Sequence, residues 1–212
     1  MGQFTGKTVV ISGGAEGIGL SIARALGKQG MNVVLGDIDP VQLEQALSRL
    51  KADGVRAIGV TMDVTSISLW QHLAEQATNQ FGKIHMLVNN AGVGGGTGSI
   101  EQADTLDWRW VLDVNLMGVL YGTQTIVPLI KKHGEGGWLI NVASMAGMVG
   151  VPYAGAYTAT KTAVVGMSEA WYAELKPHNI KVSVLCPAFV KTRINLSERN
   201  RQPGYQHVEH EG

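Results

Sequence analysis

Short apolar runs alternate with segments of helical periodicity along almost the whole chain. The runs have the length and β-branched content of buried strands, and the segments between them repeat apolar residues every three to four positions. Strict alternation with short connections predicts a parallel sheet covered by helices on both faces, which is a doubly wound α/β (Rossmann) fold in a single domain. Strands are expected at residues 7–12, 32–37, 56–64, 84–92, 138–144 and 181–187.

The helical segments are marked by their first residues and by their breaks. Pro40 suits the first turn of one helix, and Ser66 is expected to cap another. A long apolar stripe around Val119 predicts a single helix that Pro128 should end or kink. Another helix is expected over residues 155–176.

Composition narrows the class of protein. The 212 residues are 45% apolar and 16% charged with a formal net charge of zero, which is typical of a globular chain and gives no basic field for nucleic acid or an anionic membrane. No apolar run approaches the length of about 20 residues that a membrane span needs. The single cysteine, Cys186, and the lack of a signal peptide favour the cytoplasm. His207 and His210 are interpreted as part of a solvated tail, so no metal site is predicted.

Glycines cluster between the first strand and the helix after it. Ser12 ends the strand, Gly13 begins the loop, and Gly17, Ile18 and Gly19 open the helix. Glycines here let the turn tighten and let backbone N–H groups approach an anion, where the helix N-terminus adds positive potential. An ordinary flexible turn would also explain them. The interpretation as a phosphate-binding loop therefore depends on the strand before it and the helix after it.

An acid ends the second strand, 18 residues after Gly19. Asp37 at this place would accept hydrogen bonds from the ribose hydroxyls of an adenosine. It would also repel the 2′-phosphate of NADP. Glu16 would add a second negative charge, and no Arg or Lys neighbours either acid in the sequence. Asp37 could instead be a turn or helix-capping residue, but together with the glycine loop it predicts NAD as the cofactor.

Four polar side chains predict a reaction centre. Tyr157 and Lys161 lie one turn apart on the same face of their helix. Ser144 closes the fifth strand, and Asn115 interrupts an apolar helical stripe. Each alone has a plainer explanation, such as packing, a surface charge, a turn cap or a hydrogen-bonded core amide.

The chemistry of alcohol oxidation explains why these four residue types would act together. A phenol with a pKa of about 10 becomes a useful base only when its anion is stabilised. We therefore expect Tyr157 to be the general acid/base and Lys161, with the positive nicotinamide, to lower its pKa. Ser144 would orient the substrate oxygen, and Asn115 would hold a water that relays the proton.

These motifs, in this order, resemble the short-chain dehydrogenase/reductase family over nearly the whole chain. Two positions depart from the family pattern, because Ser12 stands for threonine and Ala188 for glycine. The matching motifs, besides the glycine loop and the reaction centre, are Asp63-Val64, Asn89-Asn90-Ala91-Gly92 and the turn from Pro187 to Thr192. The resemblance implies that the cofactor also contacts Asp63, Val64, Asn90, Tyr157, Lys161, Val190 and Thr192.

The resemblance also sets expectations for the end of the chain and for assembly. Family members normally continue to a seventh strand, whereas this sequence stops at Gly212. Residues 1–192 are interpreted as the dinucleotide-binding and catalytic domain, and 193–212 as the truncated start of a substrate-covering segment. The full-length protein is expected to be a homodimer or homotetramer. The sequence as it stands should form at most a dimer, with the sixth strand as a bare edge.

The sequence thus predicts an oxidoreductase that moves a hydride between NAD(H) and a small-molecule substrate. Apolar residues around Val93 and after Ser144 favour a hydrophobic secondary alcohol or ketone, although acyl thioesters stay open. The alternative is a dinucleotide-binding regulatory or interaction protein with weakened catalysis. The complete set of Asn, Ser, Tyr and Lys argues against that alternative.

Overall fold

The structure, a computed structural model, describes residues 2–206. His207 and His210, and the end of the predicted substrate-covering segment, lie outside the described residues. No helix in the described part of the chain is long and apolar enough to cross a membrane.

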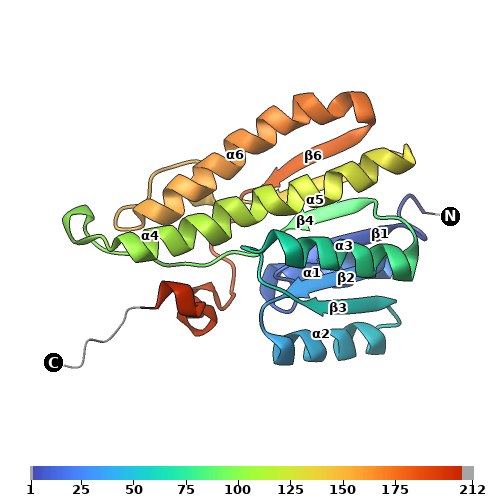
Figure 1. The fold of residues 1–212 in the computed structure, drawn as a ribbon, viewed down its shortest axis with the longest axis horizontal. Coiled ribbons are helices and arrows are strands. Elements are labelled where there is room, and N and C mark those ends of the chain that lie inside the picture. The colour runs from blue at the N-terminus through green and yellow to red at the C-terminus, as the bar shows by residue number, and fades with distance from the viewer. Residues whose placement is uncertain (1, 207–212) are drawn as a thin grey trace.

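One parallel sheet forms the centre of the molecule (Figure 1). Its strand order is β3-β2-β1-β4-β5-β6, and every neighbouring pair is parallel. The chain moves outward from β1 in one direction and from β4 in the other, so the carboxyl ends of these two strands mark the place where sheets of this kind bind ligands. The strands are β1 (Thr8–Ser12), β2 (Asn32–Asp37), β3 (Ala57–Thr61), β4 (Met86–Asn89), β5 (Gly137–Val142) and β6 (Ile180–Leu185).

Helices cover the sheet, as the doubly wound fold predicted. Neighbouring residues of a strand point to opposite faces, so Val10 packs in the core beneath α3 and α5, whereas Val9 packs in the core beneath α1 and α2. In Figure 1, α4, α5 and α6 lie together along the upper part of the molecule. The helices are α1 (Gly17–Lys28), α2 (Pro40–Ala52), α3 (Ile67–Phe81), α4 (Thr105–Leu112), α5 (Gly118–His133) and α6 (Gly155–Leu175).

One helical expectation needs correction, and a second, that Pro128 ends or kinks its helix, is narrowed. The predicted single helix around Val119 is interrupted by a π-helical turn at Asp113–Met117, which separates α4 from α5. Pro128 does not end α5, which continues to His133. A proline costs the helix one backbone hydrogen bond, but residues on both sides of Pro128 are buried against the sheet, and this packing keeps the helix intact.

The last described residues form short 3₁₀ turns, at Ile194–Asn200 and Pro203–Tyr205, and no strand, as their polar sequence predicted. We call residues 193–205 the terminal segment. It lies beside α4 at the end of the molecule where the strands have their carboxyl ends (Figure 1). Within residues 2–206, β6 is the outermost strand on its side of the sheet.

Candidate active site

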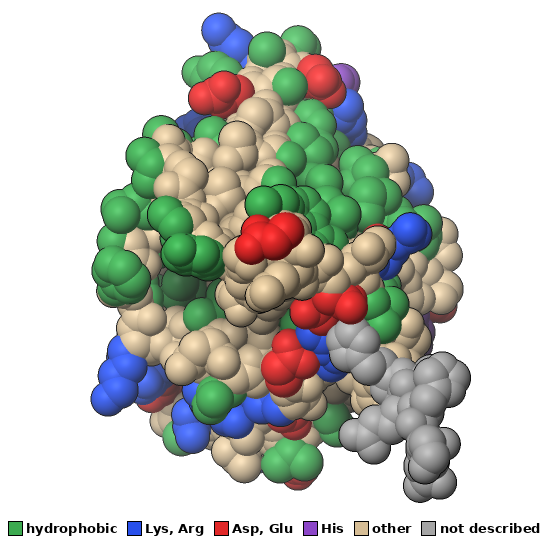
Figure 2. All heavy atoms as spheres, turned by 90° about the vertical axis from the view of Figure 1, so that its left-hand side faces the viewer, with side chains coloured by type: hydrophobic (Ala, Val, Ile, Leu, Met, Phe, Trp, Pro, Cys, Tyr) green, Lys and Arg blue, Asp and Glu red, His purple; other side chains and the backbone are tan. Residues whose placement is uncertain are grey.

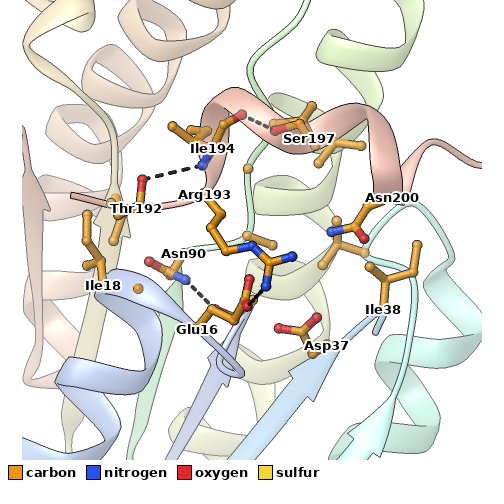
Figure 3. Close-up of a pocket in the computed structure, with 18 of the residues that line it drawn as sticks. Glu16, Ile18, Asp37, Ile38, Asn90, Thr192, Arg193, Ile194, Ser197 and Asn200 are labelled. Carbon is orange, nitrogen blue, oxygen red and sulfur yellow. Dashed lines mark hydrogen bonds and ion pairs between the residues drawn. The ribbon is translucent and has the colours of Figure 1, made fainter. Parts of the chain in front are cut away.

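A cleft runs along the carboxyl ends of the strands and brings most of the predicted site residues together. One end lies at the glycine loop and the end of β2, and the other lies at the start of α6. The terminal segment forms its upper wall (Figure 3). Predicted site residues that line it are Gly13, Gly17, Ile18, Asp37, Asp63, Val64, Asn90, Ser144, Tyr157, Lys161, Val190 and Thr192. The remaining predicted site residues, Ser12, Gly19 and Asn115, do not line the cleft.

The glycine loop is held by the residues that follow β4. The Ser12 hydroxyl accepts hydrogen bonds from the backbone N–H groups of Asn90 and Ala91, at 3.1 and 3.2 Å. The side-chain amide of Asn90 donates to the backbone oxygens of Ser12 and Gly13, at 3.0 and 2.7 Å. A side chain at Gly19 would begin 2.3 Å from the oxygen of Gly13, so only glycine lets α1 start this close to the loop.

Asp37 lies where the chain leaves β2 and faces the cleft. Its carboxylate accepts hydrogen bonds from the backbone N–H groups of Ala15 and Asp39, at 2.9 and 3.1 Å. Burial raises the pKa of this carboxyl group, and the two backbone N–H donors oppose that rise. The helix-capping role is taken by Asp39, whose side chain accepts from Val41 and Gln42 at the start of α2. Asp37 is therefore not the cap of α2.

The carboxylate of Asp63 holds the loop that follows β3. One oxygen accepts from the backbone N–H of Thr65 at 2.9 Å, and the other accepts from the side-chain amide of Gln202 at 2.8 Å. Asp63 and Val64 lie beyond the end of β3 at Thr61, so the third strand is shorter than the predicted 56–64. The fourth strand is shorter too and ends at Asn89.

Ser144, Tyr157 and Lys161 meet at the opposite end of the cleft. Ser144 follows β5 and caps a short turn by accepting from the backbone N–H of Ala146 at 3.2 Å. Lys161, on α6, is only 3% exposed, and its Nζ donates to the backbone oxygen of Val142 at 3.0 Å. The same Nζ lies 5.6 Å from the centre of the Tyr157 ring.

Burial controls both titratable groups at this end. It lowers the pKa of Lys161 to about 8, because an ammonium loses its hydration there. It also raises the pKa of Tyr157, a shift that a hydrogen bond with Ser144 only partly opposes. Burial therefore acts on the Tyr157 pKa in the direction opposite to that expected of Lys161 and the nicotinamide together, which are predicted to lower it.

Asn115 is fully buried in the π-helical turn, where its amide pairs with the loop after β4. It accepts from the backbone N–H of Val93 at 2.8 Å and donates to the oxygen of the same residue at 2.9 Å. A side chain at Gly92 would begin 3.3 Å from the Asn115 oxygen and 3.4 Å from Lys161 Nζ, so the glycine keeps these two groups facing one space. π-turns often occur at functional sites.

A second set of buried polar side chains supports the cleft from below, and Asn89 is the one among them that the sequence singled out. Asn89 donates to Thr123 at 3.0 Å and to the oxygen of Asn141 at 2.9 Å, and Asn141 donates to Ser168 at 2.9 Å. These buried side chains join β4, β5, α5 and α6. The motif around Asn89 was visible in the sequence, but its partners were not.

The ion pairs of the terminal segment are the main feature that the sequence missed. Arg193 and Arg199 both pair with Glu16, although no basic residue neighbours Glu16 in the sequence. The sequence could not predict this pairing, because the arginines are 177 and 183 residues further along the chain. Thr192, just before the segment, accepts weakly from the N–H of Ile194 at 3.4 Å. The segment was expected to cover the substrate, but not to pair with the glycine loop.

Apolar side chains lie exposed beside the reaction centre. Figure 2 looks onto this end of the molecule and shows hydrophobic side chains over much of the face, with acidic and basic groups both above and below them. Exposed apolar residues that follow β5 and β6 are Met145, Met148, Val149, Val151, Tyr153, Phe189 and Val190. Within residues 2–206 no group of three or more His, Cys, Asp or Glu side chains could hold a metal ion.

Comparison with known proteins agrees with this architecture. The family model described as short chain dehydrogenase matches residues 7–203. The chain is 35% identical over 207 residues to the CLA biosynthesis dehydrogenase/reductase of Lactiplantibacillus plantarum, covering 97% of this chain and 72% of that protein. It is 39% identical over 191 residues to the 3-alpha-(or 20-beta)-hydroxysteroid dehydrogenase of Mycobacterium tuberculosis, covering 90% and 72%.

A solved structure extends the likeness to three dimensions. The short chain dehydrogenase/reductase from Burkholderia phymatum, in complex with NAD, is 38% identical and superposes with a TM-score of 0.94. The match covers 98% of this chain and 74% of that chain. With the sheet order, the glycine loop and the Ser-Tyr-Lys group in place, the chain belongs to the short-chain dehydrogenase family.

Proposed function

We propose that this protein transfers a hydride between NAD(H) and a hydrophobic secondary alcohol or its ketone. The observation that carries the proposal is the single cleft, which has Asp37 at one end and Ser144, Tyr157 and Lys161 at the other. A dinucleotide that spans such a cleft brings its nicotinamide to the tyrosine when its adenosine ribose lies at the acid.

The residues around the glycine loop fit NAD. Gly13 has φ +61°, and a side chain there would begin 2.7 Å from the backbone of Ala91, so the loop presents its backbone to the cleft. The first turn of α1 holds no acidic residue, and the carboxylate of Glu16, at the N-cap, is paired with Arg193 and Arg199. The helix N-terminus therefore keeps its attraction for a diphosphate. Asp37 keeps lone pairs for ribose hydroxyls beyond the two backbone N–H groups that it accepts. The NAD-bound relative from Burkholderia phymatum supports the same cofactor.

The reaction centre can orient an alcohol and take its proton. Bound NAD supplies the acceptor for the hydride that leaves the carbinol carbon. The Ser144 hydroxyl holds the substrate oxygen beside Tyr157, and the ionised Tyr157 Oη accepts the hydroxyl proton. Lys161 in its charged form stabilises the tyrosinate, and a bound nicotinamide adds positive charge that the free protein lacks. In ketone reduction the same proton returns from Tyr157.

The substrate class follows from the surface beside the reaction centre. The exposed methionine, valine and phenylalanine side chains after β5 and β6 offer an apolar wall with few hydrogen-bond partners. Such a wall favours alicyclic, aryl or steroid-like alcohols over sugars. The hydroxysteroid dehydrogenase of Mycobacterium tuberculosis, at 39% identity, supports this class.

The test is an NAD-linked screen of alicyclic, aryl and steroid alcohols, followed at the nicotinamide absorbance. We expect turnover with at least one of them and a loss of about 10³-fold in the Tyr157→Phe variant. NADH binding without turnover of any alcohol or ketone would overturn the proposed reaction and favour a regulatory dinucleotide-binding protein.

A further inference from the structure

Two arginines of the terminal segment share one carboxylate of the glycine loop. Arg193 Nη1 donates to Oε1 of Glu16, and Arg199 Nη2 donates to Oε2 at 2.8 Å. Arg199 is further held by the backbone oxygens of Arg193 and Leu196, at 3.0 and 2.9 Å. One carboxylate cannot neutralise two guanidinium groups, so these three side chains together carry a net positive charge.

The terminal segment is also bonded to the body of the protein at other points. Ser197 accepts from the backbone N–H of Gly94 at 3.0 Å. The side chain of Gln202 donates to Asp63 and accepts from the indole N–H of Trp110, both at 2.8 Å. Because these bonds join the segment to the loops after β3 and β4 and to α4, whereas Glu16 lies in the glycine loop, the segment and its arginines have a defined position at the cleft.

The net positive charge lies at the adenosine end of the cleft. Asp37, Glu16, Arg193 and Arg199 all line the same cavity. In Figure 3 the Arg193 guanidinium reaches down from the segment to Glu16, on the side where Asp37 lies. Asp39 lines the cavity too, but its carboxylate caps α2. Asp37 also lines this part of the cleft, and its carboxylate accepts hydrogen bonds from backbone N–H groups instead of from an arginine.

We propose that Arg193 and Arg199 are specificity-determining residues, which bind phosphate oxygens at the ribose 2′ position and so limit the preference for NAD. The inference rests on the proposed function, because it needs the adenosine ribose to lie at Asp37. Guanidinium groups match phosphate oxygens with paired N–H donors. The Glu16 carboxylate keeps both guanidinium groups beside the ribose, and a 2′-phosphate would compete with Glu16 for them. The preference for NAD then depends on Asp37 alone and not on Asp37 with Glu16.

Coenzyme titrations of the whole protein test this. The dissociation constants of NADH and NADPH are measured by nicotinamide fluorescence for the wild type, for the double variant Arg193→Gln with Arg199→Gln, and for Glu16→Gln. We expect the double variant to weaken NADPH binding by about tenfold while NADH changes little, as loss of a charged hydrogen bond predicts. Glu16→Gln should tighten NADPH binding, because it frees the arginines.

The titrations separate the two contributions best when the arginine substitutions are combined with Asp37→Asn. Removing this charge should tighten NADPH binding by about tenfold or more. Adding the two arginine substitutions should take most of that gain away. Competition by 2′-phosphoadenosine 5′-phosphate against adenosine 5′-phosphate should follow the same pattern, which would assign the effect to the 2′-phosphate and not to the nicotinamide end.

A matched arginine outside the cleft is the control. Arg24 pairs with Asp53 at 2.7 Å, and the Arg24→Gln variant should leave both constants unchanged. Equal losses of NADH and NADPH in the double variant, or no change in their ratio in any variant, would overturn the inference. Failure of the wild type to bind either coenzyme would instead overturn the proposed function, so the two failures are distinct.

Discussion

The two ends of the cleft differ in how their charged side chains are surrounded. At the reaction end Lys161 is buried and its ammonium is bonded to the backbone oxygen of Val142. At the adenosine end Glu16, Arg193 and Arg199 pair with one another and stay partly open to water, with side chains 27%, 46% and 28% exposed. Desolvation shifts the pKa values of Tyr157 and Lys161 at one end, whereas at the other end we propose that the paired charges select the coenzyme.

Because of this difference, we expect one end of the cleft to control the turnover rate and the other to control the affinity for the coenzyme. A buried group whose charged form is unstable responds strongly when a ligand brings a new charge. A half-exposed ion pair responds weakly, because water and salt screen it. We therefore expect substitutions at the reaction end to change turnover by orders of magnitude, and substitutions at the adenosine end to change coenzyme affinity by smaller factors.

The largest effect is expected at Tyr157. Tyr157→Phe removes the proton acceptor and should lower kcat by about 10³-fold, the usual weight of general acid–base catalysis. NADH binding should persist, because the ring is retained. Steady-state rates and NADH titration measure the two effects, with Tyr172→Phe on the exposed side of the same helix as the control. Substantial residual turnover would show that another group is the acid/base.

Lys161 offers a second test of the reaction end. Lys161→Met should lower kcat by about 10²-fold yet stabilise the fold by about 2 kcal/mol, because a buried ammonium is costly. The folded pKa of about 8 lies below the unfolded value of 10.5, so the unfolded state binds the proton more tightly. Wild-type stability should therefore rise between these two pH values, and the variant should lack this rise.

Urea unfolding at several pH values measures this effect, with Lys132→Met as an exposed control. A variant that is less stable than the wild type near neutral pH would mean that the bond to Val142 outweighs the desolvation of the ammonium.

Coenzyme preference should be a smaller effect. We expect the wild type to favour NADH over NADPH by at least about tenfold, or 1.4 kcal/mol, because Asp37 opposes a 2′-phosphate. Asp37→Ala should narrow the difference. Fluorescence titration checks both, and equal binding of the two coenzymes by the wild type would contradict the role given to Asp37.

The smallest effect is expected far from the cleft, at the amino end of β4. His85 Nδ1 accepts from the backbone N–H of Thr8 at 3.1 Å, which requires the neutral ring, and Nε2 lies 3.2 Å from Glu135. Burial first, and then Lys7, lowers the His85 pKa below its usual 6.5. The unfolded state therefore takes the proton first as the pH falls, and stability is lost below about 6.5.

A His85→Gln variant should flatten this pH dependence and leave NADH affinity unchanged. Urea unfolding between about pH 7.5 and 5 checks the first statement, and titration checks the second. A change in NADH affinity would show that the two ends of the strands are coupled.

The sequence predicted those parts of the site that depend on local order. These parts are the glycines after a strand, the acid at the end of β2 and the Tyr-x-x-x-Lys spacing on a helix. Each depends on residues that are close in the sequence, so its position does not require knowledge of distant partners. Family membership and the parallel sheet were confirmed. The roles of Asn115, Ser144, Tyr157 and Lys161 stay predictions, as do the cytoplasmic location and the homo-oligomeric state.

The features that the sequence did not predict depend on distant partners. The pairing of Arg193 and Arg199 with Glu16 joins the two ends of the described chain, and no periodicity encodes it. The continuity of α5 through Pro128 depends on burial against a sheet, which a local rule for proline cannot include. The interruption before α5 depends on Asn115 finding the backbone of Val93.

That π-turn lets the chain carry one residue that a regular helix would not hold. A π-turn holds one residue more than an α-turn, and its wider turn takes up that residue, so the helices on both sides keep their apolar faces toward the core. Loss of one residue within Asp113–Met117 would therefore leave a regular helix with Trp110 still buried. The change would fall on the position of Asn115 and its two bonds to Val93, and so on the shape of the cleft more than on the stability of the fold.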